Sequence, residues 1–276
     1  MTISRTTVFQ LFKYVVYALL TLNVFLFGRE EHLAALLQFP EGVGLQTLIE
    51  AYAATIDTAA WVVLLLMFEL ETCVLEDRHF TPRVTLALHG TRVFCYTFIV
   101  YAFYGYIANA IFAYDVVALP NINDLCMLAT DQWSYAVTLD EYTDITALNC
   151  TTLTNNSSFW QLGVLPAVVD HSGLIDIQRL AWVDVINAGV WILIVVILEI
   201  DVRLQERNHL EGRALTISNI LKIIFYSILF LAAVYWGIKG DFVDFWDAFL
   251  WLLAFFFIEL NVFEWRQEEA EEKLLI

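Results

Sequence analysis

Three segments of the chain share a spacing of polar, aromatic and acidic residues that could handle an ion inside a membrane. Each begins with an aspartate or asparagine, has a tryptophan four residues later, and carries a glutamate eight residues after that tryptophan. A further polar residue follows two positions on. The three copies of this motif are Asp57, Trp61, Glu69 and Glu71; Asn187, Trp191, Glu199 and Asp201; and Asp247, Trp251, Glu259 and Asn261. No gap interrupts the alignment, which indicates an internal repeat.

Helix geometry gives the motif a spatial meaning. On an α-helix, its first, fifth and fifteenth positions lie within about 40° of one another. We therefore expect Asp57, Trp61 and Glu71 to form one stripe about 21 Å long, and the other two copies to form equivalent stripes. The glutamates at the thirteenth position point about 120° away from the stripe, toward a neighbouring helix.

Carboxylates at these places suggest ion handling. An ionised carboxylate near the bilayer centre costs roughly 2.5–3.5 kcal/mol on insertion scales, so such residues usually face protein or water. If the three stripes face a shared interior, their first residues form one polar ring and their last residues form a second. Rings of carboxylates select cations by charge, and a desolvated carboxylate can also carry protons. The motif therefore predicts a pathway for a cation or a proton.

A purely structural role for the same acids is the alternative. In that interpretation the tryptophans pack or line the membrane interface. The motif glutamates then form ion pairs near the cytoplasmic interface with basic residues on the other helix of each hairpin, namely Lys13, Arg92 and Lys222.

Long apolar helices are needed to position these residues, and the composition is consistent with them. Of the 276 residues, 60% are hydrophobic and only 16% are charged, with a mean hydropathy of +0.67. So few charges cannot cover a soluble domain. About 20 apolar residues span a bilayer, and six segments qualify: 9–28, 51–73, 91–114, 181–202, 217–238 and 244–264. All four prolines fall between them, so we expect an all-α bundle of about six unbroken transmembrane helices.

The spans pair into three consecutive hairpin repeats, residues 9–73, 91–202 and 217–264, within a single transmembrane domain covering residues 1–276. The first helix of each hairpin carries a weaker shared form, in which a lysine or threonine precedes a tyrosine by four residues. These tyrosines are Tyr17, Tyr101 and Tyr226. The segment 115–180 is then a long insertion in the loop of the second hairpin.

Basic residues predict the orientation. With the N-terminus in the cytoplasm, most of the 14 lysines and arginines lie on the cytoplasmic side. Only Arg29, Arg179 and Lys239 lie on the other side. This bias follows the positive-inside rule. It predicts a protein of the plasma or inner membrane with cytoplasmic N- and C-termini and an extracytoplasmic segment 115–180.

The segment 115–180 carries eight acids and a single basic residue, so it presents a negative surface that enriches cations. It also contains Cys126 and Cys150. We expect these to form a disulfide that closes a loop of 24 residues and contributes about 3 kcal/mol on the chain-entropy estimate. Two free thiols are the alternative.

Several function classes are disfavoured. The net charge of −17 argues against nucleic acid, whose phosphates require clustered lysine and arginine. The chain contains no Walker, dinucleotide-binding, zinc-protease or serine-hydrolase motif, and no histidines pair at the helical spacing needed for haem. Cys73, His79, His89 and Cys95 surround one cytoplasmic turn but match no standard zinc spacing. We expect no enzymatic activity, no cofactor and no metal site.

Two functions fit these features. In the first, the protein is a channel-like or ion-coupled transport component that handles a cation or proton through its repeated acids. In the second, it is a non-catalytic accessory or scaffold subunit whose aromatic side chains contact a larger membrane complex. Proline-free helices count against the broken-helix sites of many secondary transporters and leave both functions open. The expected partners are the lipid bilayer, a cation or proton, and other membrane subunits or further copies in a homo-oligomer.

Overall fold

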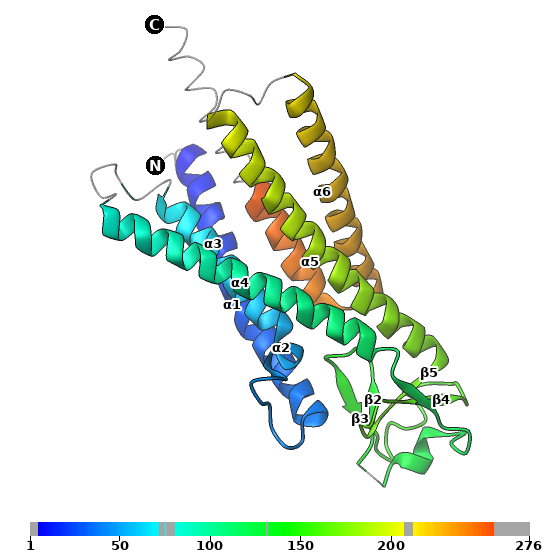
Figure 1. The fold of residues 1–276 in the computed structure, drawn as a ribbon. Coiled ribbons are helices and arrows are strands. Elements are labelled where there is room, and N and C mark those ends of the chain that lie inside the picture. The colour runs from blue at the N-terminus through cyan, green and yellow to red at the C-terminus, as the bar shows by residue number, and fades with distance from the viewer. Residues whose placement is uncertain (1–4, 72–74, 76–80, 131, 207–211, 257–276) are drawn as a thin grey trace, which may run out of the picture. The chain divides into compact units, whose positions relative to one another are not determined.

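The computed structural model (Figure 1) describes residues 5–71, 75, 81–130, 132–206 and 212–256. Within them 71% of the residues are helical, so the prediction of a mostly helical protein is confirmed. The chain divides into two compact units. Unit 1 contains residues 1–23 and 190–276, and unit 2 contains residues 24–189.

The helices are α1 (Arg5–Gln38), α2 (Leu48–Ala51), α3 (Ala53–Glu69), α4 (Pro82–Phe112), α5 (His171–Glu206) and α6 (Arg213–Lys239). Residues 242–256 are also helical. Four helical stretches among the described residues are long and apolar enough to cross a membrane: Phe9–Gln38, Pro82–Phe112, His171–Gln205 and Arg213–Lys239. They correspond to four of the six predicted spans. The other two predicted spans, 51–73 and 244–264, continue beyond the described residues.

Several helices are longer than the predicted spans. Helix α4 begins at Pro82 rather than at residue 91, and α5 begins at His171 rather than at residue 181. The hydropathy pattern marks only the apolar middle of a helix, whereas the capping residue determines where the helix begins. At α4 the Thr81 hydroxyl accepts a hydrogen bond from the Val84 amide, and Pro82 occupies the first turn, where its missing N–H costs nothing.

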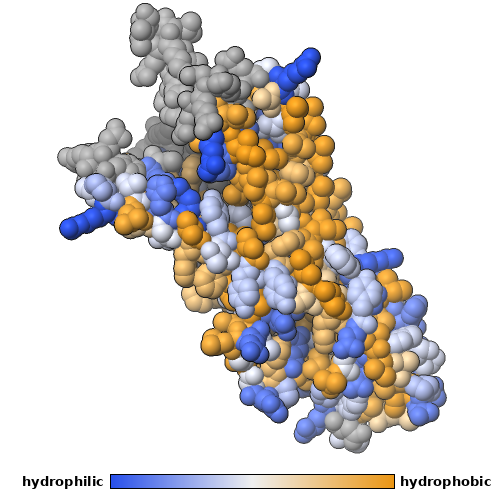
Figure 2. Space-filling model, viewed as in Figure 1, coloured by the Kyte–Doolittle hydropathy of each residue, from blue (hydrophilic) through white to orange (hydrophobic). Residues whose placement is uncertain are grey.

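The surface of the long helices is apolar. On α6, Ile223, Phe230 and Leu231 are each more than half exposed, and Figure 2 shows hydrophobic side chains covering the visible face of this helix. A soluble protein rarely exposes an apolar patch of this extent. The hydrocarbon of a bilayer is a solvent that suits such a surface, which agrees with helices able to cross a membrane.

In unit 1, α6 turns directly into the helix over residues 242–256. Gly240 ends α6 with a φ of +85°, a left-handed conformation that glycine adopts without strain. The Phe245 ring then lies against Gly237, where an added Cβ would stand 3.2 Å from the ring. The left-handed turn at Gly240 and the contact between Phe245 and Gly237 together place the following helix beside α6 at the turn.

In unit 2, α4 packs along α3 and against α2. The helices approach closely at Gly105 of α4, where an added Cβ would lie 2.7 Å from the backbone oxygen of Ile49 in α2. Any larger residue there would push the two backbones apart. Glycine at this position therefore allows the tight packing that holds α4 against the start of α3.

Between α4 and α5 the chain forms a small sheet, which we call the strand domain (residues 116–170). Its elements are β1 (Val116–Ala118), a 3₁₀ turn η3 (Leu125–Leu128), β2 (Ser134–Ala136), β3 (Tyr142–Asp144), β4 (Phe159–Leu162) and β5 (Ala167–Asp170). The strand order is β1-β4-β5-β2-β3, and β2 and β5 pair in parallel while the other pairs are antiparallel. Figure 1 shows this sheet at the end of α4 and the start of α5. The all-α prediction is wrong for this segment.

A disulfide and an apolar core hold the strand domain together. The predicted bond between Cys126 and Cys150 is confirmed. All four residues of β5 are buried. Val168 packs in one hydrophobic cluster with Leu125 and Phe159, while Val169 packs in another with residues of α4 and α5. The strand domain is therefore packed onto the ends of both helices.

Candidate functional site

Asp247 is the motif acid with the most unusual surroundings. Its Oδ1 accepts a hydrogen bond of 2.8 Å from the side-chain amide of Asn23, which lies on α1 and is fully buried. The indole N–H of Trp251, one turn further along the same helix, donates to the same carboxylate. Among the described residues, no lysine, arginine or histidine contacts Asp247. This acid is therefore held by two neutral donors rather than by a counter-charge.

Asn23 itself is only half satisfied. Its amide nitrogen donates to Asp247, but its buried Oδ1 has no hydrogen-bond partner among the described residues. A buried acceptor without a partner costs about 1–3 kcal/mol, and such groups are rare in native proteins. The Asn23–Asp247 pair thus contains one acceptor for which a donor is missing.

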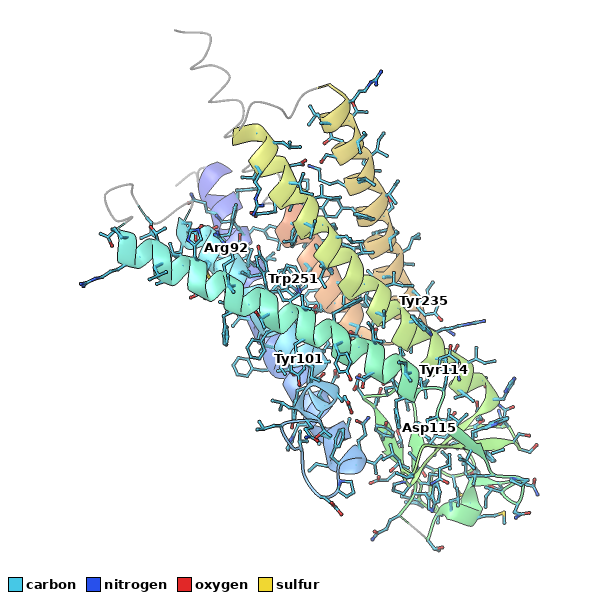
Figure 3. The ribbon with its side chains drawn as sticks, in the orientation of Figure 1. Arg92, Tyr101, Tyr114, Asp115, Tyr235 and Trp251 are labelled. Atoms are coloured by element: carbon cyan, nitrogen blue, oxygen red, sulfur yellow. A yellow bond between two sulfur atoms is a disulfide. The ribbon has the colours of Figure 1, made fainter. Side chains whose placement is uncertain are left out.

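Buried aromatic rings pack around Trp251. The Trp191 ring on α5 lies 6.4 Å from the Trp251 ring and 4.5 Å from the Phe255 ring, measured between centroids. All three side chains are buried. Figure 3 labels Trp251 on the helix that also carries Asp247. Two motif tryptophans therefore meet in unit 1, and one of them, Trp251, is also a hydrogen-bond donor to Asp247.

The last acid of the second motif copy, Asp201, is in a buried ion pair. The Asp201 carboxylate lies 3.2 Å from the Lys222 ammonium of α6, and it accepts a 2.6 Å hydrogen bond from the Ser218 hydroxyl. Both ionic side chains are less than 10% exposed. Glu199, two residues earlier, instead pairs with Arg203 on the surface of the same helix. These contacts assign both acids a role in holding or covering helices.

The first motif copy lies in unit 2. The Tyr106 hydroxyl donates to Asp57 over 3.4 Å, and Trp61 is buried. Glu71 accepts two hydrogen bonds, at 2.8 and 3.0 Å, from the Arg92 guanidinium of α4. Figure 3 labels Arg92 near the start of α4. Glu69 is buried. In this copy, too, the acid at the end of the stripe is neutralised by a basic residue.

The other predicted site residues have different environments. The Asn187 Oδ1 is buried and has no hydrogen-bond partner within the described ranges. Of the motif tyrosines, Tyr17 is buried, Tyr101 is exposed and Tyr226 lies between these extremes. The three tyrosines therefore do not occupy equivalent places. Glu259 and Asn261 lie outside the described residues.

Sequence reasoning missed Glu31, a buried acid on α1. Its carboxylate accepts hydrogen bonds from the backbone amides of Ala54 and Thr55 and from the Thr55 hydroxyl, at 2.7, 3.0 and 2.5 Å. These amides belong to the first turn of α3, whose preceding residue, Tyr52, provides no side-chain cap. Glu31 therefore caps α3 from a neighbouring helix. Because its partners are distant in sequence, no local pattern marks it.

Asp170 organises the junction between the strand domain and α5. It is buried, and its Oδ1 accepts hydrogen bonds from the Gly173 amide and the Ser172 hydroxyl, as a helix N-cap does. The hydroxyls of Tyr135 and Thr154 donate to its other oxygen. Burial alone would raise the pKa of Asp170, but these hydrogen bonds outweigh it and hold the pKa below the usual range.

Asp170→Asn is expected to lower the stability of the strand domain by about 2 kcal/mol at pH 7, because a charged cap and its hydrogen bonds are lost. A carboxyl with a depressed folded-state pKa stabilises the fold above its unfolded-state pKa of about 3.9. That contribution is lost as the pH falls through the folded-state value. The melting temperatures of the two proteins should therefore converge in acid. The exposed Glu141→Gln is the control, and an Asp170→Asn effect of the same size at every pH would contradict this role.

No group of three or more histidine, cysteine, aspartate or glutamate residues within the described ranges could hold a metal ion. Cys73 and His79 lie outside those ranges. The comparisons with known proteins give no match: no family model, no curated protein and no solved structure resembles the chain.

Proposed function

We propose that the protein is an integral membrane, ion-coupled transport component that handles a cation or proton at Asp247. The main observation in favour of this function is the surroundings of Asp247. It lies on an apolar helix, with two neutral hydrogen-bond donors and no basic partner among the described residues. An acid in such a place is expensive for a membrane protein to keep, which makes a functional role the default hypothesis.

The ion pairs reduce the number of acids that could handle the ion. Glu71, Glu199 and Asp201 each contact a basic side chain, so they offer less free negative charge than the motif alone predicts. We therefore assign ion handling to the first position of the motif and a structural role to these three acids. Asp57, which accepts a hydrogen bond from Tyr106, is the equivalent candidate in unit 2.

The same proposal includes the membrane topology. Four apolar helices, together with the helical residues of the two remaining spans, support six crossings arranged as three hairpins. The distribution of basic residues supports cytoplasmic termini. The strand domain then lies on the extracytoplasmic side, an environment that permits disulfides such as Cys126–Cys150.

Ion flux into proteoliposomes tests the transport function. Purified full-length protein is expected to pass protons or a monovalent cation under an imposed potential. Asp247→Asn, which keeps the shape but removes the charge, should lower the flux about tenfold or more, as expected when a barrier rises by about 1.4 kcal/mol. Glu199→Gln changes an exposed, paired acid of the same motif and should leave the flux unchanged. Wild-type protein that passes no proton or cation would exclude this function.

An accessory or scaffold subunit is the second candidate. The observation in its favour is the number of large side chains exposed on the helices, including Phe25, Phe94 and Tyr104, since aromatic residues are enriched in protein interfaces. Co-purification at fixed stoichiometry with another membrane protein, combined with wild-type behaviour of Asp247→Asn, would favour this role over transport.

A further inference from the structure

The unsatisfied oxygen of Asn23 points to the identity of the ion. An amide side chain has two donors on nitrogen and an acceptor on oxygen. Asn23 uses its nitrogen to donate to Asp247, while its fully buried Oδ1 has no partner among the described residues. Asp247 is its hydrogen-bonded neighbour, but an ionised carboxylate has no donor to return. The pair is therefore incomplete with Asp247 charged.

We propose that the ion at this site is a proton, carried by Asp247 as a neutral carboxylic acid paired with Asn23; this rests on the proposed transport function. A protonated carboxyl carries both a donor and an acceptor, so it can pair reciprocally with an amide, which also carries both. The amide N–H already donates to Oδ1 of Asp247 at 2.8 Å. The O–H of the protonated carboxyl then supplies the donor that the Asn23 oxygen lacks. Both groups are satisfied only when the proton is present.

A metal cation fits the same site poorly. Two N–H donors, from Asn23 and Trp251, are directed at the carboxylate, and their partial positive charge repels a cation. Hard cations such as Ca²⁺ require six or more oxygen ligands, whereas the site offers the oxygens of two side chains. Trp251, which is buried against the rings of Trp191 and Phe255, adds an N–H donor and an apolar ring to the site rather than a further oxygen ligand.

Two basic side chains of α5 and α6 are paired with other acids of unit 1. Lys222 faces Asp201, and Arg203 faces Glu199, so these cations are used elsewhere. Proton binding forms one O–H bond between the proton and a carboxylate oxygen of Asp247. Release breaks that bond, returns the proton to water or to the next acceptor, and leaves a carboxylate that keeps its two N–H donors. No other reactant is consumed.

Infrared difference spectroscopy on the purified full-length protein tests the proposal. A protonated carboxyl has a C=O stretching band distinct from the carboxylate bands. We expect this band at neutral pH in the wild type, its loss in Asp247→Asn, and its retention in Glu199→Gln. Asn23→Leu, which removes the reciprocal partner, should shift the band. Isotopic labelling of aspartate carboxyl groups in the wild type shows whether the band belongs to an aspartate, and its loss in Asp247→Asn then assigns it to Asp247.

The outcomes separate this inference from the transport function. Ion flux without the carboxyl band at neutral pH would overturn the proton and leave transport of another cation. The band without any flux would support the protonated Asp247–Asn23 pair and refute the proposed function. An aspartate band that Asn23→Leu leaves unshifted would overturn the pairing.

Discussion

Lys222→Met is expected to destabilise unit 1 by about 3–5 kcal/mol, the usual cost of leaving one partner of a buried ion pair alone. Asp201 would remain with a single hydrogen bond from Ser218 and with less than 5% of its side chain exposed. A buried charge without its counter-charge has lost the attraction that offset its desolvation. Thermal unfolding of the purified protein in one fixed detergent measures the effect.

The surface pair of Glu199 and Arg203, on the helix that also carries Asp201, provides the matched control. Arg203→Met removes the partner of Glu199, but both side chains are more than half exposed, so we expect a change of only about 0.5 kcal/mol or less. The double variant Asp201→Leu, Lys222→Met should recover most of the stability, because no lone charge remains. Similar melting temperatures for Lys222→Met and Arg203→Met would contradict a buried structural pair.

Replacing Cys126 and Cys150 by serine is expected to cost the strand domain about 3 kcal/mol, the entropy of closing a loop of this length. The domain is small, with strands of three or four residues, so this is a large share of its stability. Limited proteolysis should cleave the variant within residues 116–170 much faster than the wild type. Hydrogen exchange should show the same segment losing protection.

Cys95→Ala serves as the control for the loss of sulfur itself. Cys95 is a buried, unbonded thiol on α4, so its substitution should affect packing locally and leave cleavage within the strand domain unchanged. If the double serine variant were cleaved no faster than Cys95→Ala, the disulfide would not be what holds the strands together.

The long helices could be predicted because their signal is strong. A run of about 20 apolar residues has few alternatives to a membrane-spanning or fully buried helix. The strand domain could not be predicted in the same way. Its strands are too short for an alternating pattern, and β5 is buried on both faces, so its Val168-Val169 sequence shows no polar alternation. Its sheet is specified by contacts distant in sequence.

The partners of the acids were predicted only in part. Arg92 and Lys222 were expected to face motif glutamates, and both do contact motif acids. The contacted residues, however, are Glu71 and Asp201, which stand at the last position of the stripe. Each of them belongs to the predicted hairpin before that of its basic partner, so the expectation of pairs within one hairpin is wrong for Arg92 and Lys222. The helical period gives the angle between positions along one helix but does not say which side the next helix covers. That choice depends on packing at close contacts such as Gly105, which a single sequence does not reveal.

The cap that Glu31 gives to α3 has a consequence for membrane insertion. Backbone amides at the start of a helix need an acceptor, and lipid offers none. Those of Ala54 and Thr55 find it on Glu31 of α1, a helix that leaves the ribosome before α3. If α3 crosses the membrane as we propose, these amides are satisfied only when α3 lies beside α1, so the two segments should enter the bilayer as a unit.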